Sequence, residues 1–181
     1  ANGGLAACIS GLLNAVLGRH ETLDCVFAPH IYSDLSLIAE CLDRLDDRLR
    51  RTRVSVAPYL VRPQDWRRVL GEYRSADTVL AMRFHANLCA AGLGSPVTGL
   101  STHHKISGLY EGLSLSDRCH RLDPAGDVGA VVAAAMSQAE ADLDPAIGER
   151  ARLRQKSSRD IERARLSDFH ADMDRWIAER L

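Results

Sequence analysis

Short apolar segments alternate with amphipathic segments along most of this chain, and this alternation restricts the fold more than any other feature of the sequence. The segments that we predict as strands are 23–28, 53–58, 78–82, 96–100 and 119–122. The segments that we predict as helices are 5–17, a stretch capped by Ser33 or Asp34 that ends near 45, 63–73, 86–93 and 127–143. Parallel strands need long crossovers, which are usually helices. We therefore predict an α/β fold with a doubly wound, Rossmann-like, mostly parallel sheet and helices on both faces.

The chain divides into two regions, 1–144 and 145–181. From Pro145 onward, charged residues alternate with widely spaced apolar ones, which indicates a solvated helix or helix pair with a narrow apolar stripe. A doubly wound domain usually begins with a strand, whereas here Gly3 and Gly4 lead directly into a helix. We expect 1–144 to be a domain without its first strand, in a fragment of a longer protein, and 145–181 to be a helical extension.

The composition excludes several functional classes. Of 181 residues, 46% are hydrophobic and 26% are charged, which is typical of a soluble globular protein. No apolar run approaches the roughly 20 residues of a membrane-spanning helix. A formal net charge of −1 disfavours a general nucleic-acid binder, which needs a basic surface. The five cysteines are odd in number and widely spaced, so we favour free buried thiols in a reducing, cytoplasmic compartment over a disulfide framework.

Polar side chains follow four of the predicted strands, at the point where each strand ends. They are His30, Tyr59, then Arg83 with His85, then His103 and His104 with Lys105. In parallel sheets, ligands bind outside the carboxyl ends of the strands. Because cationic and hydrogen-bonding groups gather there, we expect this rim of the sheet to bind an anion.

The triplet Arg83-Phe84-His85 lies where the third strand ends and a helix begins, so free backbone N–H groups would point at a bound anion. Arg83 can clamp a phosphate or carboxylate with two hydrogen bonds. His85 can transfer a proton, because an imidazole titrates near neutral pH. The structural alternative pairs Arg83 with Asp77 or Asp65. In that alternative His85 only packs under the helix.

His103, His104 and Lys105 begin 20 residues after Arg83, in a segment that we predict as a loop. They could form an anion site, an exposed polar turn or a metal site, and the metal site is least favoured because no carboxylate accompanies them. Gly108 would permit a tight turn that brings Lys105 back to the cleft.

Segments of this chain resemble the polysaccharide pyruvyl transferase family. Members carry an aspartate before an apolar strand, then Arg, an aromatic or aliphatic residue, His and Ala, followed by a Gly-x-Pro turn and Lys-Val/Ile-x-Gly. A proline, a histidine and an aspartate at the end of a preceding strand are also similar. The matching segments here are 29–34, 75–86, 90–97 and 105–109, with weaker agreement in element order from 5 to about 143.

The resemblance implies the C-terminal domain of a two-domain enzyme with GT-B architecture, whose active site lies in the cleft between domains. The implied reaction transfers pyruvate from phosphoenolpyruvate to two hydroxyls of a sugar, as a cyclic ketal, in cell-surface polysaccharide or exopolysaccharide biosynthesis. Arg83 and Lys105 would hold the phosphate and carboxylate of phosphoenolpyruvate, and His85 would be the general acid. The residues that would contact the acceptor or line the rim are His30, Tyr59, His103 and His104. No metal and no cofactor besides the donor substrate is implied.

The partners that the resemblance implies are phosphoenolpyruvate, a lipid- or nucleotide-linked saccharide and the N-terminal domain of the same protein, without nucleic acid. A lipid-linked acceptor would bring the protein to the membrane surface. The family often has an acidic residue and a proline where this chain has His103 and His104. Because we expect the N-terminal domain to be missing, we expect the isolated chain to be inactive. Two alternatives stay open: the nucleotide-sugar-binding domain of a GT-B glycosyltransferase, and a non-catalytic domain of the same fold.

Overall fold

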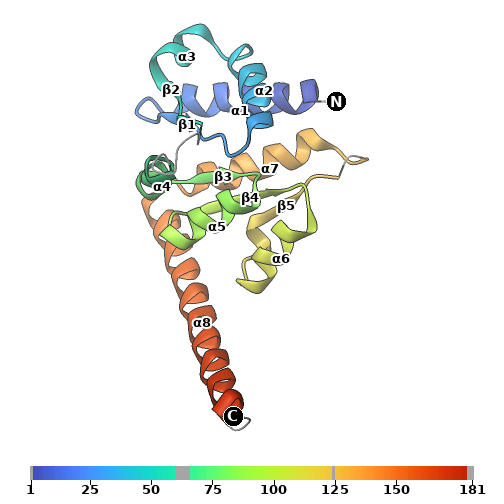
Figure 1. The fold of residues 1–181 in the computed structure, drawn as a ribbon. Helices are drawn as coiled ribbons and strands as arrows, with labels where there is room; N and C mark the ends of the chain where they lie inside the picture. The colour runs from blue at the N-terminus through green and yellow to red at the C-terminus, as the bar shows by residue number, and fades with distance from the viewer. Residues whose placement is uncertain (1, 60–65, 124, 179–181) are drawn as a thin grey trace.

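The computed structural model describes residues 2–59, 66–123 and 125–178, in which helices and short strands alternate (Figure 1). The strands are β1 (Cys25–Phe27), β2 (Val54–Val56), β3 (Val79–Ala81), β4 (Val97–Ser101) and β5 (Cys119–Arg121). The helices are α1 (Asn2–Arg19), α2 (Tyr32–Leu42), α3 (Asp47–Arg53), α4 (Trp66–Ser75), α5 (Phe84–Leu93), α6 (His104–Gly112), α7 (Val128–Ala141) and α8 (Pro145–Ala178), with a 3-10 turn at Ser116–Arg118.

All recorded strand pairs are parallel, which confirms the predicted α/β fold with parallel strands. Within the described residues the strands form two small sheets, β1-β2 and β3-β4-β5, whereas we predicted one doubly wound sheet. Pro29 and Pro58 follow β1 and β2 within two residues, and a proline has no N–H with which to extend a ladder. The first two strands therefore stay short.

Helices cover both faces of the three-stranded sheet (Figure 1). On one face, Val97 packs in a cluster with side chains of α4, α5 and α6, and on the other Leu100 packs with side chains of α1, α2 and α7. All five residues of β4 are buried, as expected for a central parallel strand. Each of these two fully buried side chains stabilises the fold by roughly 1.5–3 kcal/mol.

Several predicted helix ends are confirmed, and one is displaced. Gly94 ends α5 in the left-handed conformation (φ 85°), and the Asp127 side chain accepts from the N–H of Ala130 (3.0 Å) at the start of α7. The N-cap of α2 is Ile31, not Ser33 or Asp34. Asp34, the third residue of α2, still stabilises the start of the helix, because its carboxylate accepts from the N–H of Ile31 (3.1 Å).

The structure corrects the prediction of a loop at His103-His104-Lys105. These residues are the start of α6, with His103 as the N-cap, and Gly108 lies inside the helix rather than at a tight turn. The helix forms because Ile106 and Tyr110, 3% and 1% exposed, pack in the main core cluster. Burial of one helix face thus outweighs the weak helix propensity of the local sequence.

Helix α3 lies in a segment where no helix was predicted from the sequence. Asp46 caps it by accepting from the N–H of Leu49 (3.0 Å). The Asp47 carboxylate pairs with Arg50 (2.6 Å) and with Arg51 (2.8 Å), one helical turn further on. Such pairs add a few tenths of a kcal/mol each, and the buried side chain of Leu49 provides the packing.

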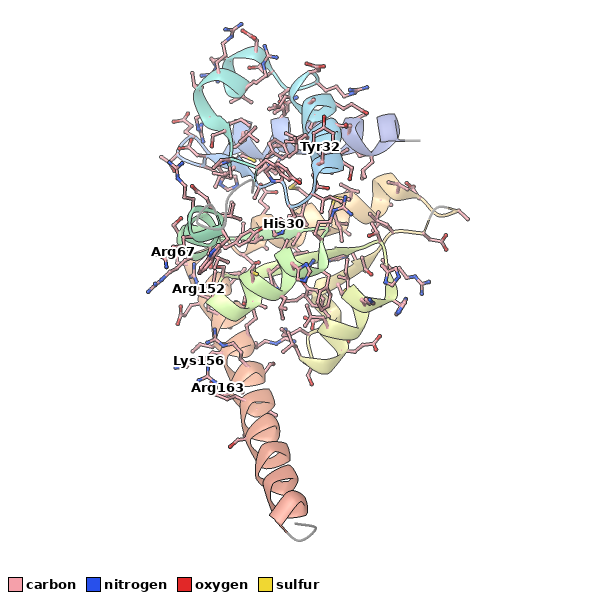
Figure 2. All side chains as sticks on the ribbon, viewed as in Figure 1. His30, Tyr32, Arg67, Arg152, Lys156 and Arg163 are labelled. Carbon is pink, nitrogen blue, oxygen red and sulfur yellow. The ribbon has the colours of Figure 1, made fainter. Side chains whose placement is uncertain are left out.

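Helix α8 packs on the body at its start and then extends away from it (Figure 1). Ala151 and Gln155 are 5% and 2% exposed, which marks the packed face. Arg152, Lys156 and Arg163 lie along one side of the projecting helix in Figure 2. Across 2–59, 66–123 and 125–178, no helix combines the length and the apolar character needed to cross a membrane.

Gly99 of β4 lies against the ring of Tyr110, so a larger residue should not fit there. A Cβ atom at this position would lie 2.6 Å from Cε2 of Tyr110, whose hydroxyl is fixed by a hydrogen bond to Oδ1 of Asn87 (2.6 Å). We expect Gly99→Ala to lower the free energy of unfolding by about 1–3 kcal/mol in urea titrations, because the ring cannot move without losing that bond. Gly92→Ala is the matched control, since an added Cβ there meets nothing within 4 Å. Equal stabilities of the two variants would contradict this packing.

Candidate functional site

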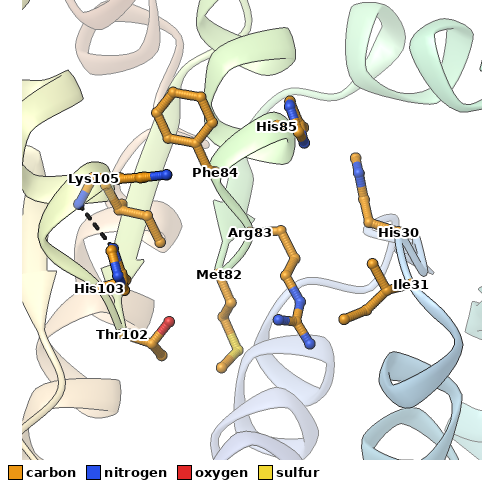
Figure 3. Close-up of a pocket in the computed structure, with 10 residues that line it drawn as sticks. His30, Ile31, Met82, Arg83, Phe84, His85, Thr102, His103 and Lys105 are labelled. Carbon is orange, nitrogen blue, oxygen red and sulfur yellow. Dashed lines mark hydrogen bonds between the residues drawn. The ribbon is translucent and has the colours of Figure 1, made fainter.

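A cavity of about 300 Å³ opens at the carboxyl ends of β3 and β4 (Figure 3). Its walls come from three segments that follow strands. After β1 come His30 and Ile31; after β3 come Met82, Arg83, Phe84 and His85; after β4 come Thr102, His103, Lys105 and Ile106. Five of the seven site residues predicted from the sequence therefore line one pocket.

The pocket is suited to an anion. None of the ten described residues that line it is acidic, and two of them, Arg83 and Lys105, carry a full positive charge. Helices α5 and α6 both begin at its wall, and the first backbone N–H groups of a helix have no partner within the helix. The N–H groups at the α5 start and the two helix dipoles add positive potential to that of the side chains, whereas at the α6 start the N–H of Lys105 is bonded to His103.

Arg83 forms an ion pair that the sequence analysis did not foresee. Its Nε (2.9 Å) and Nη2 (2.5 Å) donate to Oδ1 of Asp34, and Nη2 also reaches the hydroxyl of Ser33 at 3.4 Å. The proposed structural partners were Asp77 and Asp65, and Asp65 lies outside the described residues. The Arg83 side chain remains 45% exposed, so one edge of its guanidinium still faces solvent beside the pocket.

Asp34 connects the loop after β1 to the loop after β3. Its second oxygen, Oδ2, accepts from the backbone N–H groups of His30 (2.9 Å) and Ile31 (3.1 Å). Burial of this carboxyl opposes its ionisation, but hydrogen bonds from Arg83 and from the two N–H groups outweigh burial and lower its pKa. The ionised Asp34 thus fixes Arg83 and the His30 backbone relative to each other.

His30 is held as a neutral side chain. Its Nε2 is hydrogen-bonded to the Tyr73 hydroxyl, and the two rings stack with centroids 5.9 Å apart. Burial lowers the pKa of His30, and the nearby His85 and Arg83 lower it further against the opposing effect of Asp34. In this pocket His30 can therefore donate or accept a hydrogen bond, but it adds little positive charge near neutral pH.

Lys105 and His85 face the pocket from two different helix starts. In Figure 3, Lys105 and His103 lie on one side, His85 and His30 lie on the other, and Phe84 is between them. The Nδ1 atom of His103 accepts from the backbone N–H of Lys105 (3.2 Å), which caps α6. Both Lys105 and His85 are exposed, so a ligand could reach either side chain from solvent.

Two predicted rim residues do not line the pocket. His104 is exposed on the first turn of α6, with its ring 4.0 Å from that of His103. Tyr59 follows β2 and contacts the ring of Tyr32 edge-on, with centroids 6.5 Å apart. The structure therefore separates these two residues from the other five.

A buried amide that was not predicted from the sequence supports the pocket from behind. Asn87 is 0% exposed, and its Nδ2 donates to the carbonyl oxygens of Ala81 (3.2 Å) and Arg83 (2.8 Å), while its Oδ1 accepts from Tyr110. This amide joins the end of β3, the start of α5 and the body of α6. The signal in the sequence is a single polar residue within the otherwise apolar segment 86–93.

Comparison with known families gives one match. A family model described as polysaccharide pyruvyl transferase matches residues 14–104, which include β1 to β4 and the segments that line the pocket as far as His103. Lys105 lies one residue beyond the end of the match. No curated protein and no solved structure gives a significant match to the chain.

Proposed function

Because the chain belongs to the polysaccharide pyruvyl transferase family, a family of transferases that act on a saccharide, we propose that it transfers pyruvate from phosphoenolpyruvate to two sugar hydroxyls as a cyclic ketal. The observation that carries this proposal is the pocket between the starts of α5 and α6. It combines the cations Arg83 and Lys105, the starts of two helices and the exposed imidazoles of His85 and His103, with no acidic side chain among its described lining residues.

Phosphoenolpyruvate carries two anionic groups, a phosphate and a carboxylate, so its site needs two positive regions. Arg83 and the α5 start supply one, and Lys105 and the α6 start supply the other. The cavity of about 300 Å³ lies at the lower end of the usual range for small-ligand pockets, about 300–1,000 Å³. A small dianionic donor suits that size.

The chemistry of the proposed transfer needs a proton donor beside these cations. Proton addition to the methylene carbon of phosphoenolpyruvate creates positive character at the neighbouring carbon, which one sugar hydroxyl attacks. Phosphate leaves, and the second hydroxyl attacks the same carbon to close the ketal. The two hydroxyls release two protons: one replaces the proton that was added to the methylene carbon, and the other is taken up by the released phosphate. His85 is the proposed general acid, for the methylene carbon or for the departing phosphate. Of the two cations, Arg83 and Lys105, the one that holds the phosphate also stabilises its departure, while the other holds the carboxylate.

Asp34 is proposed as a positioning residue that acts through Arg83. We expect Asp34→Asn to lower kcat/KM for phosphoenolpyruvate by about 10-fold, because a carboxamide cannot hold the guanidinium through charge-assisted hydrogen bonds. Asp47→Asn is a charge-matched control, since the Asp47 carboxylate pairs with arginines on the exposed side of α3. Equal kcat/KM values for Asp34→Asn and the wild type would exclude the positioning role.

The stability difference between the wild type and Asp34→Asn should depend on pH. The pKa of Asp34 is lowered in the folded protein, so its ionised form stabilises the fold above the ordinary carboxyl pKa, and this contribution is lost as the pH falls through the lowered value. Wild type and Asp34→Asn should therefore differ in urea midpoint at neutral pH and converge in acid. A difference that stays constant down to strong acid would contradict the assignment.

Phosphate release by the protein in its full natural length tests the proposed function. The assay supplies phosphoenolpyruvate with a panel of lipid-linked and nucleotide-linked sugars, and it detects ketal-bound pyruvate on the acceptor after mild acid. We expect release that depends on both substrates. Protection against heat by UDP- or GDP-sugars, with none by phosphoenolpyruvate, would instead favour a GT-B glycosyltransferase. Normal pyruvylation in cells that carry Arg83→Ala would favour a non-catalytic domain.

The finer fold assignment belongs to the same proposal. In a GT-B-like architecture the pocket would be one wall of a cleft between two domains, with residues 1–144 as a Rossmann-like domain and 145–181 as its helical extension. No metal and no resident cofactor takes part in the proposed reaction, which we assign to the cytoplasm. An experimental structure of the protein in its full natural length tests the architecture.

A further inference from the structure

An exposed tyrosine, Tyr32, packs against a half-buried one, Tyr59, beside the segment that enters the pocket. Tyr32, the first residue of α2, is 75% exposed. Tyr59, after β2, meets it edge-on, with ring centroids 6.5 Å apart and planes at 75°. In the tyrosine pair, Tyr32 and Tyr59, the ring of Tyr32 is therefore the one that solvent and ligands reach most easily.

Tyr32, rather than Tyr59, connects this pair to the pocket. His30 and Ile31, the two residues before Tyr32, line the cavity, and Figure 2 shows His30 close below Tyr32. The Asp34 carboxylate holds the N–H groups of His30 and Ile31 and is itself tied to Arg83. The backbone that carries Tyr32 is thus braced against the proposed donor site, which would keep a ligand on the ring at a fixed distance from that site.

A saccharide is the ligand that this arrangement fits best. One face of a pyranose ring exposes C–H groups, which are attracted to the negative face of an aromatic ring, and the phenol hydroxyls can hydrogen-bond sugar hydroxyls. Exposing Tyr32 to water costs free energy that such stacking recovers. The pocket beside it supplies the positive charge for a donor anion, and the family implies a saccharide acceptor.

We propose that the tyrosine pair is the acceptor subsite: a pyranose stacks on Tyr32 and extends its reacting hydroxyls over Ile31 toward the pocket. The proposal rests on the function proposed above. In this proposal Tyr32 determines the affinity for the acceptor and not the rate of the chemical step.

Steady-state kinetics at saturating phosphoenolpyruvate test the subsite. We expect Tyr32→Ala to raise KM for the acceptor about 10-fold, in the range of one aromatic contact, with KM for phosphoenolpyruvate unchanged. Tyr32→Trp, which keeps a stacking ring, should restore most of the affinity and shows that the site still folds. Trp66→Ala is the matched control, because Trp66 is a 48% exposed aromatic on α4 that does not line the pocket. An unchanged KM for the acceptor in Tyr32→Ala would overturn the subsite. Phosphate release by the same variant would still support the transfer reaction.

A binding measurement that needs no turnover separates this proposal from the proposed function. In saturation-transfer NMR with methyl glycosides of the common hexoses, wild-type protein should saturate the pyranose C–H protons, and Tyr32→Ala should lose most of that signal. Saturation without any phosphoenolpyruvate-dependent phosphate release would support the sugar site and overturn the transfer reaction. Absent saturation in the wild type, or equal saturation in both proteins, would overturn the sugar site.

Discussion

Replacement of His85 by glutamine should reduce kcat for phosphoenolpyruvate-dependent phosphate release by about 10²–10⁴-fold, the usual contribution of a positioned general acid. His85 lies in the first turn of α5 and lines the pocket with Arg83 and Lys105. Glutamine keeps the size and hydrogen-bonding ability of the side chain but cannot donate a proton in the same way. Because His85 is exposed, the variant should unfold at nearly the wild-type urea concentration.

His20→Gln is the control for that result. His20 lies beyond the end of α1 and contacts the Glu140 carboxylate (2.9 Å), away from the pocket. Its replacement by glutamine should leave phosphate release unchanged. Equal kcat values for His85→Gln and His20→Gln would show that His85 is not the general acid.

The largest expected effect on stability lies at the other end of the three-stranded sheet. Arg118 and Asp142 form a buried ion pair, with side chains 6% and 1% exposed. Arg118 also donates to the carbonyl oxygen of Val97 (2.9 Å) and to the hydroxyl of Thr98 (3.2 Å), and Asp142 accepts from Thr78 (3.3 Å). This network joins the amino ends of β3, β4 and β5 to the end of α7.

Asp142→Asn should lower the free energy of unfolding by about 3–5 kcal/mol, because it leaves the Arg118 charge buried without its partner. Urea unfolding gives the value directly. Asp117→Asn, which removes the partner of Arg154 in an exposed pair, should cost at most about 1 kcal/mol. Equal losses in the two variants would show that the buried pair does not hold the strands together.

The order of strands and helices could be predicted from the sequence because each apolar segment is bounded by a local signal. Gly94 and Asp127 mark helix ends through backbone freedom and side-chain capping, and both act locally. Helix α3 was missed because its seven residues are mostly charged, and Leu49 alone gives it an apolar side. In α6, Ile106, Leu109, Tyr110 and Leu113 recur at helical spacing, but Gly108 and Gly112 lower the helix propensity of the segment and hide that signal.

The candidate site was predicted in part, for a topological reason. The rule that ligands bind at the carboxyl ends of parallel strands brought His30, Arg83, His85, His103 and Lys105 to one pocket. The partner of Arg83 could not be found in this way, because Asp34 lies 49 residues away in the chain. Likewise, the segment that carries Tyr59 ends beside Tyr32 rather than at the pocket, since β1 and β2 form a separate sheet.

Calorimetric titration with phosphoenolpyruvate tests most directly the claim that this pocket is the donor site. The measurement compares the wild type in its full natural length with Lys105→Met, which removes one exposed cation from the pocket wall, and with Lys156→Met on α8 as the matched control. We predict saturable binding of one phosphoenolpyruvate per chain to the wild type and to Lys156→Met, and binding weakened at least about 10-fold in Lys105→Met. Absent binding to the wild type, or equal affinity in all three proteins, would contradict the account.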